Sequence, residues 1–221
     1  MNQSLGIIGR KLGMTQFHTD DGTIARVTAV EAGPCVVVAK RTSDRDGYSA
    51  LQLGFGEVPE RLVKLPVRGQ YRKAGVEPRR WRLEFRVPED VAAQFNVGDE
   101  ITVDKVFKAG DFVDVVGTSK GRGFSGVMRR HHFKGAVDTH GSHEYKRHGG
   151  SIGQNMTPGH TFKGVGMPGQ HGNRRITTQN IRVVSIDTAS HIILLNGAVP
   201  GGRKALVTIR GALKKGSAKA S

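Results

Sequence analysis

Residues 23–40, TIARVTAVEAGPCVVVAK, decide the fold class, because they hold two β-rich runs separated by a break at Gly33-Pro34. The first run, 23–30, is enriched in β-branched residues, and the second, 35–40, is almost continuously apolar, as expected of a strand covered on both faces. Short β-rich runs continue on both sides, with turn signals every 8 to 15 residues. This spacing is typical of a small barrel or sandwich, so the sequence predicts a mainly β fold with minor α structure.

The other elements follow from hydrophobic period and turn residues. Alternating or apolar runs predict strands at 5–10, 14–18, 48–55, 81–87, 100–103, 112–116, 181–186, 191–195 and 204–210. Weaker patterns predict short helices at 65–75 and 89–95. The one cysteine of the chain, Cys35, excludes an intrachain disulfide and a cysteine zinc cluster, and we expect it to be a small buried side chain.

The positive charge of the chain is unevenly distributed. In total, 34 Lys and Arg residues and 19 Asp and Glu residues give a net charge of +15. Basic residues outnumber acidic ones by nine to three in 59–86, by ten to two in 118–175 and by six to none in 203–221, whereas the strand-rich segments are neutral or acidic. A merely solubilising surface would mix both signs over the folded elements. The separation favours a polyanionic partner, with nucleic acid ahead of an anionic membrane or a heparin-like polymer.

Residues 118–175 have a composition of their own, with 13 Gly, seven of the nine His and only seven residues from Leu, Ile, Val and Phe. Burial of so little apolar surface cannot offset the entropy of ordering the backbone, about 1 to 2 kcal/mol per residue. We therefore expect an extended arm that its partner orders. The predicted organisation is a globular β body at 1–117 plus 176–212, with a basic insertion at 59–86, the arm at 118–175 and a basic flexible tail at 213–221.

A glycine pattern in the arm raises an enzymatic alternative. Residues 121–126, GRGFSG, match GxGxxG after the strand at 112–116, but neither a helix of ten residues nor a second strand with an acidic end follows. The glycines can instead bring the backbone close to phosphates that Lys120 and Arg122 neutralise. A GxSxG elbow and paired carboxylates are also missing, so a nucleotide-dependent enzyme stays the weaker alternative.

The histidines of the arm raise a second alternative, a metal site. They are His131, His132, His140, His143, His148, His160 and His171. HExxH is absent and no pair lies on a recognisable helix at i, i+4 spacing, so we expect neither a metal nor another cofactor. Imidazoles among Arg and Gly are better suited to contact phosphates or stack on bases.

Two further expectations concern Trp81 and the membrane. Trp81 is expected in the core, with Arg80 and Arg82 pointing outward and available to phosphate. No apolar run approaches the roughly 20 residues that span a bilayer, and 1–9 lacks the features of a signal peptide. We therefore expect a soluble, cytosolic protein without a membrane partner.

Several motifs in register resemble one known family. They are GRKLGMT at 9–15, DGY at 46–48, VGTSKGRGF at 116–124, GSIGQNMTPG at 150–159 and GAVPG at 197–201. Together they resemble the bacterial large-subunit ribosomal protein number three, in the same order and over nearly the whole chain. The resemblance implies a structural ribosomal protein in the cytoplasm that performs no chemistry.

The family resemblance also implies a fold and partners. The fold would be a small translation-protein-type β-barrel with a long extended RNA-binding loop. The protein would be a primary binder of 23S ribosomal RNA near its 3′ end, acting early in subunit assembly, and its loop would reach toward the peptidyl transferase centre. Its other partners would be the large-subunit proteins numbered fourteen and nineteen, with neither DNA nor a membrane.

The candidate RNA-binding residues come from the charge pattern and the resemblance together. In and beside the arm they are Lys120, Arg122, Arg129, Arg130, His131, His132, Lys134, Lys146, Arg147, His148, Lys163, Arg174 and Arg175, and in the insertion they are Arg68, Arg72, Lys73, Arg80 and Arg82. By resemblance, the tip nearest the catalytic RNA would be Gly153, Gln154, Asn155, Met156 and Thr157.

Two positions depart from the family pattern. Some relatives carry a methylated glutamine where this chain has Met156, so we do not expect that modification here. Relatives often have Trp-Asn in place of His131-His132, which leaves the stacking role there open.

Overall fold

The computed structural model describes residues 4–19 and 22–215, which fall into two compact units. We call the first unit, which runs to Thr118 and resumes at Arg175, the body, and the second, Ser119–Arg174, the arm unit. Of the predicted tail at 213–221, residues 216–221 lie outside the described residues. The two units are treated separately below.

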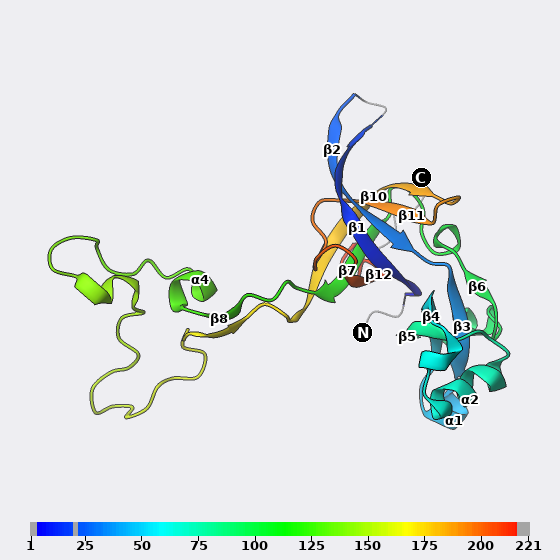
Figure 1. The fold of residues 1–221 in the computed structure, drawn as a ribbon, viewed down its shortest axis with the longest axis horizontal. Helices are drawn as coiled ribbons and strands as arrows, with labels where there is room; N and C mark the ends of the chain where they lie inside the picture. The colour runs from blue at the N-terminus through cyan, green and yellow to red at the C-terminus, as the bar shows by residue number, and fades with distance from the viewer. Residues whose placement is uncertain (1–3, 20–21, 216–221) are drawn as a thin grey trace. The chain divides into compact units, whose positions relative to one another are not determined.

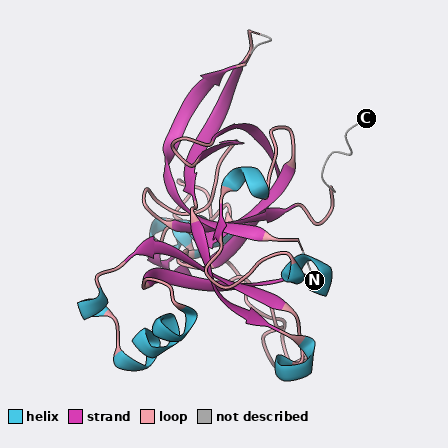
Figure 2. Cartoon of the chain, turned by 90° about the vertical axis from the view of Figure 1, so that its right-hand side faces the viewer, coloured by secondary structure: helices cyan, strands magenta, loops and turns pink. Residues whose placement is uncertain are grey.

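Six antiparallel strands of the body form a sheet that closes on itself (Figures 1 and 2). They pair in the order β1 (Gly6–His18), β12 (Leu206–Gly211), β7 (Phe112–Thr118), β10 (Arg175–Asp187), β11 (Ile192–Asn196) and β2 (Ile24–Ala32), and β2 returns to β1. Closure gives each strand of this sheet two neighbouring strands and so shortens its exposed edges, although residues 13–18 of β1 pair with β2 alone.

A second sheet of the body carries most of its helical structure. Its strands pair in the order β5 (Arg79–Arg86), β4 (Ala50–Glu57), β3 (Cys35–Arg41) and β6 (Glu100–Ile101). The connections contain α1 (Ser43–Asp46), η1 (Glu60–Leu62), α2 (Leu65–Ala74), α3 (Glu89–Ala93) and η2 (Val103–Lys105). Pro66 in the first turn of α2 and the left-handed Gly75 after its last turn give the helix clear ends.

One hydrophobic core joins the two sheets of the body. The closed sheet contributes Ile7, Val115 and Leu195, and the second sheet contributes Leu53 and Phe85, all fully buried. Each such side chain stabilises the fold by about 1.5 to 3 kcal/mol through burial.

Two residues with reactive or charged side chains, Cys35 and Lys11, are buried in the body. Cys35 is fully buried, as predicted, and burial raises the pKa of its thiol to about 12, so the thiol stays protonated and unreactive. Lys11 is also buried, and its Nζ donates to the carbonyl oxygens of Val199 at 2.7 Å and Gly201 at 3.2 Å. These bonds tie β1 to the loop before β12.

The structure confirms the mainly β prediction and corrects several boundaries. The runs 5–10 and 14–18 belong to one 13-residue strand, β1, because an irregularity between Lys11 and Gly13 lets the strand continue. Of 100–103, only Glu100–Ile101 is a strand, and the 3-10 helix η2 follows. The helices predicted at 65–75 and 89–95 are present, and the strands predicted at 181–186 and 191–195 are present and pair antiparallel. No helix of the described residues is long and apolar enough to cross a bilayer.

We expect Gly9→Ala to destabilise the body by about 1 to 3 kcal/mol. A Cβ on Gly9 would lie 2.6 Å from the Glu31 carbonyl oxygen and 2.9 Å from a Val30 methyl group, so β1 and β2 would have to separate. Urea unfolding followed by the fluorescence of Trp81, the one tryptophan of the chain, measures the change. Gly13→Ala in the same strand is the matched control, since a Cβ there meets nothing within 4 Å. Equal stability of the two variants would contradict this packing.

Candidate nucleic-acid interface

The arm unit carries positive charge that it does not neutralise itself. Ser119–Arg174 holds nine Lys and Arg residues against two carboxylates, Asp138 and Glu144. Within the arm unit, all of which is described, one ion pair forms, between Lys146 Nζ and Asp138 at 3.8 Å. An exposed pair at this distance contributes little to stability. The other cations are left to attract a polyanion.

The arm unit contains short elements that its composition did not predict. The strand β8 (Gly123–Ser125) pairs antiparallel with β9 (Gly169–His171), and Ser119 and Arg122 donate their backbone N–H groups to the carbonyls of Arg174 and His171, both at 2.9 Å. Composition predicted an extended arm that its partner orders, and the structure adds these short elements to that arm. Backbone hydrogen bonds between the two ends of the segment provide order where apolar burial is scarce.

The GxGxxG motif has a structural explanation in this unit. Gly123 and its neighbours form β8, and Gly126 precedes α4 (Val127–His131), which has five residues and ends at the left-handed His132. A Rossmann site needs a longer helix at this point. On the partner side, Gly172 has a φ of 71°, and a Cβ there would collide with the Lys120 carbonyl. Gly172 thus allows two backbone segments to approach closely, whereas a Cβ on Gly121, Gly123 or Gly126 of the motif would meet no atom closer than 3.6 Å.

Two of the candidate residues help to hold the arm unit together. Arg130 donates from Nη1 to the Met167 carbonyl oxygen at 2.6 Å, and His131 Nε2 lies 3.0 Å from the same oxygen. The His131 ring also packs against Phe133 with ring centroids 5.9 Å apart. Arg130 and His131 therefore connect α4 to the segment that leads into β9.

The other candidate residues of this region are exposed to solvent. They are Lys120, Arg122, Arg129, His132, Lys134, Arg147, His148, Lys163, Arg174 and Arg175. Lys146 is half-buried, and Arg175 lies in the body as the first residue of β10. The tip residues Gly153, Gln154, Asn155, Met156 and Thr157 are exposed as well.

Apolar and aromatic side chains of the arm unit are also exposed, which charge counting missed. The exposed fraction is 79% for Phe124, 63% for Tyr145, 87% for Met156 and 53% for Phe162. Flat rings beside cations form the surface on which unpaired bases stack. The signal in the sequence was the interleaving of these residues with basic ones, for example Phe124 next to Gly123 and two residues from Arg122.

Some candidate residues of the basic insertion have partners within the body, and others are exposed to solvent. Arg68 and Arg72 both pair with Glu60, at 3.2 and 3.0 Å, so part of their charge is already balanced. Lys73 is exposed, and Arg80 stacks on the Trp81 ring at 4.9 Å. Trp81 packs against the core as predicted. Arg82 is not free, because its Nη1 donates to Gln70 Oε1 at 2.6 Å.

The electrostatics of the arm unit lower the pKa of His171. Partial burial disfavours its protonated form, and the nearby positive charges of Arg122, Arg129, Arg130 and His132 act in the same direction. The described residues contain no group of three His, Cys, Asp or Glu side chains arranged to hold a metal ion.

Comparison with known proteins gives a consistent result. A family model described as Ribosomal protein L3 matches residues 87–192. The chain is 50% identical over 215 residues to the large ribosomal subunit protein uL3 of Sorangium cellulosum, covering 97% of this chain and 92% of that protein. It is 49% identical over 210 residues to uL3 of Myxococcus xanthus, covering 95% and 93%, and 50% identical over 212 residues to uL3 of Acidothermus cellulolyticus, covering 96% and 94%.

We expect the pKa of His171 to lie below the ordinary value of 6.5 and to rise in Arg122→Ala. Removal of a nearby positive charge makes protonation of the imidazole easier, so the direction of change is upward. Titration of the His171 ring by NMR measures both values. Arg174→Ala is the matched control, since Arg174 is not among the main charges that lower this pKa and its removal should raise it less. An unchanged midpoint in Arg122→Ala would contradict the arrangement of cations around β8 and β9.

Proposed function

Because the chain belongs to the family of large ribosomal subunit protein uL3, we propose that it acts through ribosomal RNA contacts made by its arm unit and its basic insertion. As a member of this family it is a structural constituent of the large ribosomal subunit and not an enzyme. Its direct partner in this proposal is 23S ribosomal RNA near the 3′ end, bound early in subunit assembly.

The observation that carries the proposal is the unneutralised charge of the arm unit. Nine cations face two carboxylates there, and aromatic rings lie exposed between them. A polyphosphate supplies the missing negative charge, and its bases supply faces for the exposed rings. Within this proposal, Lys120, Arg122 and Arg129 contact phosphates, whereas Arg130 and His131 position α4.

We further assign the tip at 153–157 to the neighbourhood of the peptidyl transferase centre. Its support is the match of 150–159 to the family motif and the exposure of all five residues. Gln154 and Asn155 carry amides that donate and accept hydrogen bonds, and Met156 presents an apolar side chain. These side chains would shape the catalytic RNA without taking part in its chemistry. The methylated glutamine of some relatives is not expected here, because Met156 occupies that position.

The body has a different role in this proposal. Its closed sheet corresponds to the translation-protein-type barrel of the family and serves as a rigid platform for the segments that contact RNA. The large-subunit proteins numbered fourteen and nineteen are its proposed protein neighbours. The nucleotide-dependent enzyme is set aside, because family membership and the short helix α4 both oppose it.

We expect the triple variant Lys120→Ala, Arg122→Ala, Arg129→Ala to show a flatter salt dependence of RNA binding. Each lost phosphate contact reduces the slope of log binding constant against log salt by about 0.7 to 0.9, so the three together reduce it by about 2 to 3. Filter binding of a transcript of the 3′ domain of 23S ribosomal RNA measures the slope. Arg130 is not substituted, because its hydrogen bond to the Met167 carbonyl oxygen helps to hold the arm unit together.

The control for this experiment removes the same charge elsewhere. Arg26→Ala, Lys108→Ala, Arg182→Ala changes three exposed cations of the body outside the insertion and should leave the slope unchanged. A slope that stays at the wild-type value in the arm variant would contradict the assigned phosphate contacts. Equal affinity of the wild type for the 3′ domain and for an unrelated transcript of the same length would contradict the proposed RNA partner.

We expect chymotrypsin to cut the free protein first in the arm unit, and the RNA transcript to protect it. Phe124, Tyr145 and Phe162 are exposed there, whereas Phe85 and Tyr71 of the body are buried. Mass spectrometry of the early fragments, with and without the transcript, locates the cuts. Early cleavage that is unaffected by bound RNA would oppose a contact between these rings and RNA.

A further inference from the structure

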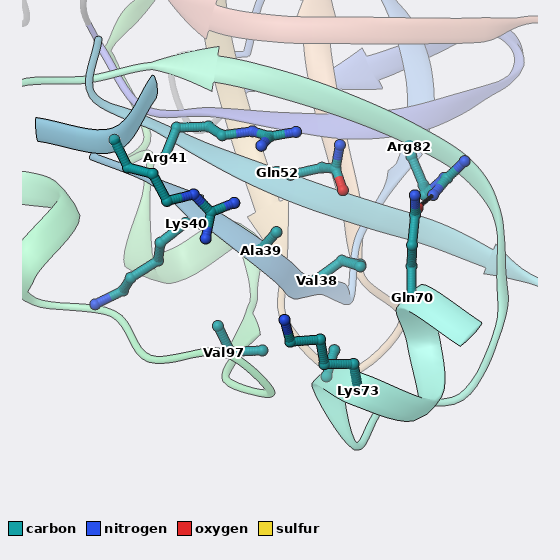
Figure 3. A pocket seen from close by; sticks show the side chains of 11 residues that line it. Val38, Ala39, Lys40, Arg41, Gln52, Gln70, Lys73, Arg82 and Val97 are labelled. Carbon is teal, nitrogen blue, oxygen red and sulfur yellow. Dashed lines mark hydrogen bonds between the residues drawn. The ribbon is translucent and has the colours of Figure 1, made fainter. Parts of the chain in front are cut away.

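A groove in the body gathers positive charge from segments that are far apart in the sequence (Figure 3). It has a volume of about 680 Å³ and lies between α2 and the second sheet. Four elements carry its five cationic lining residues, which are Lys40 and Arg41 of β3, Arg45 of α1, Lys73 of α2 and Arg82 of β5. None of its lining residues is acidic.

Two carboxylates outside the groove lining hold Arg41 in place and balance only part of the charge of the groove. Arg41 donates to Glu84 from Nε at 3.2 Å and to Asp46 from Nη1 at 3.0 Å. These bonds occupy two of the five N–H donors of the guanidinium. Glu84 also accepts hydrogen bonds from Tyr48 and Gln52. This one carboxylate therefore holds two lining residues, Arg41 and Gln52. Two carboxylates against five cations leave a surplus of three positive charges.

The opposite wall of the groove is held by α2. Gln70 and Arg82 point toward each other in Figure 3, and the 2.6 Å hydrogen bond between them fixes α2 against β5. Arg82 also lies over the Tyr71 ring at 5.6 Å. One turn along α2, Lys73 extends toward the strand that carries Val38 and Ala39. Within the described residues, Lys40 and Lys73 form no ion pair.

We propose that this groove binds the sugar-phosphate backbone of a ribosomal RNA segment, at a site separate from the arm unit. The inference rests on the proposed function, because it takes ribosomal RNA as the polyanion. Arginine forks pair well with phosphate oxygens, and the amides of Gln52 and Gln70 suit ribose hydroxyls. Since hydrogen bonds already hold Arg41 and Arg82, binding does not have to order these two side chains.

The lining favours RNA over a protein partner. The centre of a protein interface is usually depleted of charge and rich in apolar and aromatic side chains. Here the apolar part of the lining is limited to small side chains, Val38, Ala39, Ala74 and Val97. A cationic groove with amide donors and a narrow apolar floor is suited to a sugar-phosphate chain.

The proposal is tested with the triple variant Lys40→Ala, Arg45→Ala, Lys73→Ala in the full chain. Its salt slope for the 3′-domain transcript should fall by about 2 to 3, as three phosphate contacts require. The double variant Lys40→Gln, Lys73→Gln touches no ion pair of the described residues and should lower the slope by about 1.4 to 1.8, which keeps the test valid if the triple variant folds poorly. The matched control is again Arg26→Ala, Lys108→Ala, Arg182→Ala.

Hydroxyl-radical footprinting on the same transcript locates the contact. The groove variants should lose protection of one RNA segment and keep the segment protected by the arm unit. Unchanged slopes and footprints in both groove variants, together with a flattened slope in the arm variant, would contradict RNA binding by the groove. The proposed function of the arm unit would be unaffected. Full RNA binding together with loss of a neighbouring protein from reconstituted subunits would overturn RNA binding by the groove in favour of an acidic protein partner. If wild-type protein does not prefer the transcript, the proposed function itself fails.

Discussion

The antiparallel pairing of β7 with β10 is the interaction on which the organisation of the chain depends. Thr118, the last residue of β7, is the register partner of Arg175, the first residue of β10, so the arm unit begins and ends at neighbouring positions. β12 pairs with the other edge of β7, and β11 pairs with the other edge of β10. Because each doubling of loop length costs only about 0.6 kcal/mol in closure entropy, the closed sheet can carry this long insertion.

The body and the arm unit handle positive charge in different ways. The body pairs several arginines with its own carboxylates, as in Arg10 with Glu31 at 2.7 Å and Arg72 with Glu60 at 3.0 Å. The arm unit has few carboxylates, and its arginine Arg130 donates to a backbone carbonyl instead. Backbone hydrogen bonds and left-handed glycines therefore give the arm unit its shape, and most of its charge stays available to a partner.

Sequence patterns predicted those features that neighbouring residues determine, namely buried strands and helix ends. The apolar run at 35–40 became the buried strand β3, and Pro66 and Gly75 bounded the helix α2. Register and closure were beyond such patterns, because they depend on pairing between strands such as β1 and β12, which lie at opposite ends of the chain. The order in the arm unit was missed for a similar reason. Its β8–β9 ladder joins positions more than forty residues apart, and a count of apolar residues contains no information on such bonds.

Charge counting along the chain failed for the groove because charge acts through space. Residues 1–58 hold equal numbers of acidic and basic residues and therefore looked neutral, yet Lys40, Arg41 and Arg45 lie together in a groove lining that includes no carboxylate. Conversely, Arg68 counted fully as a candidate although Glu60 partly neutralises it. A carboxylate behind an arginine orients it toward a ligand, whereas one in front competes with phosphate. That difference in placement separates an RNA-binding arginine from a structural one, and only the fold decides it.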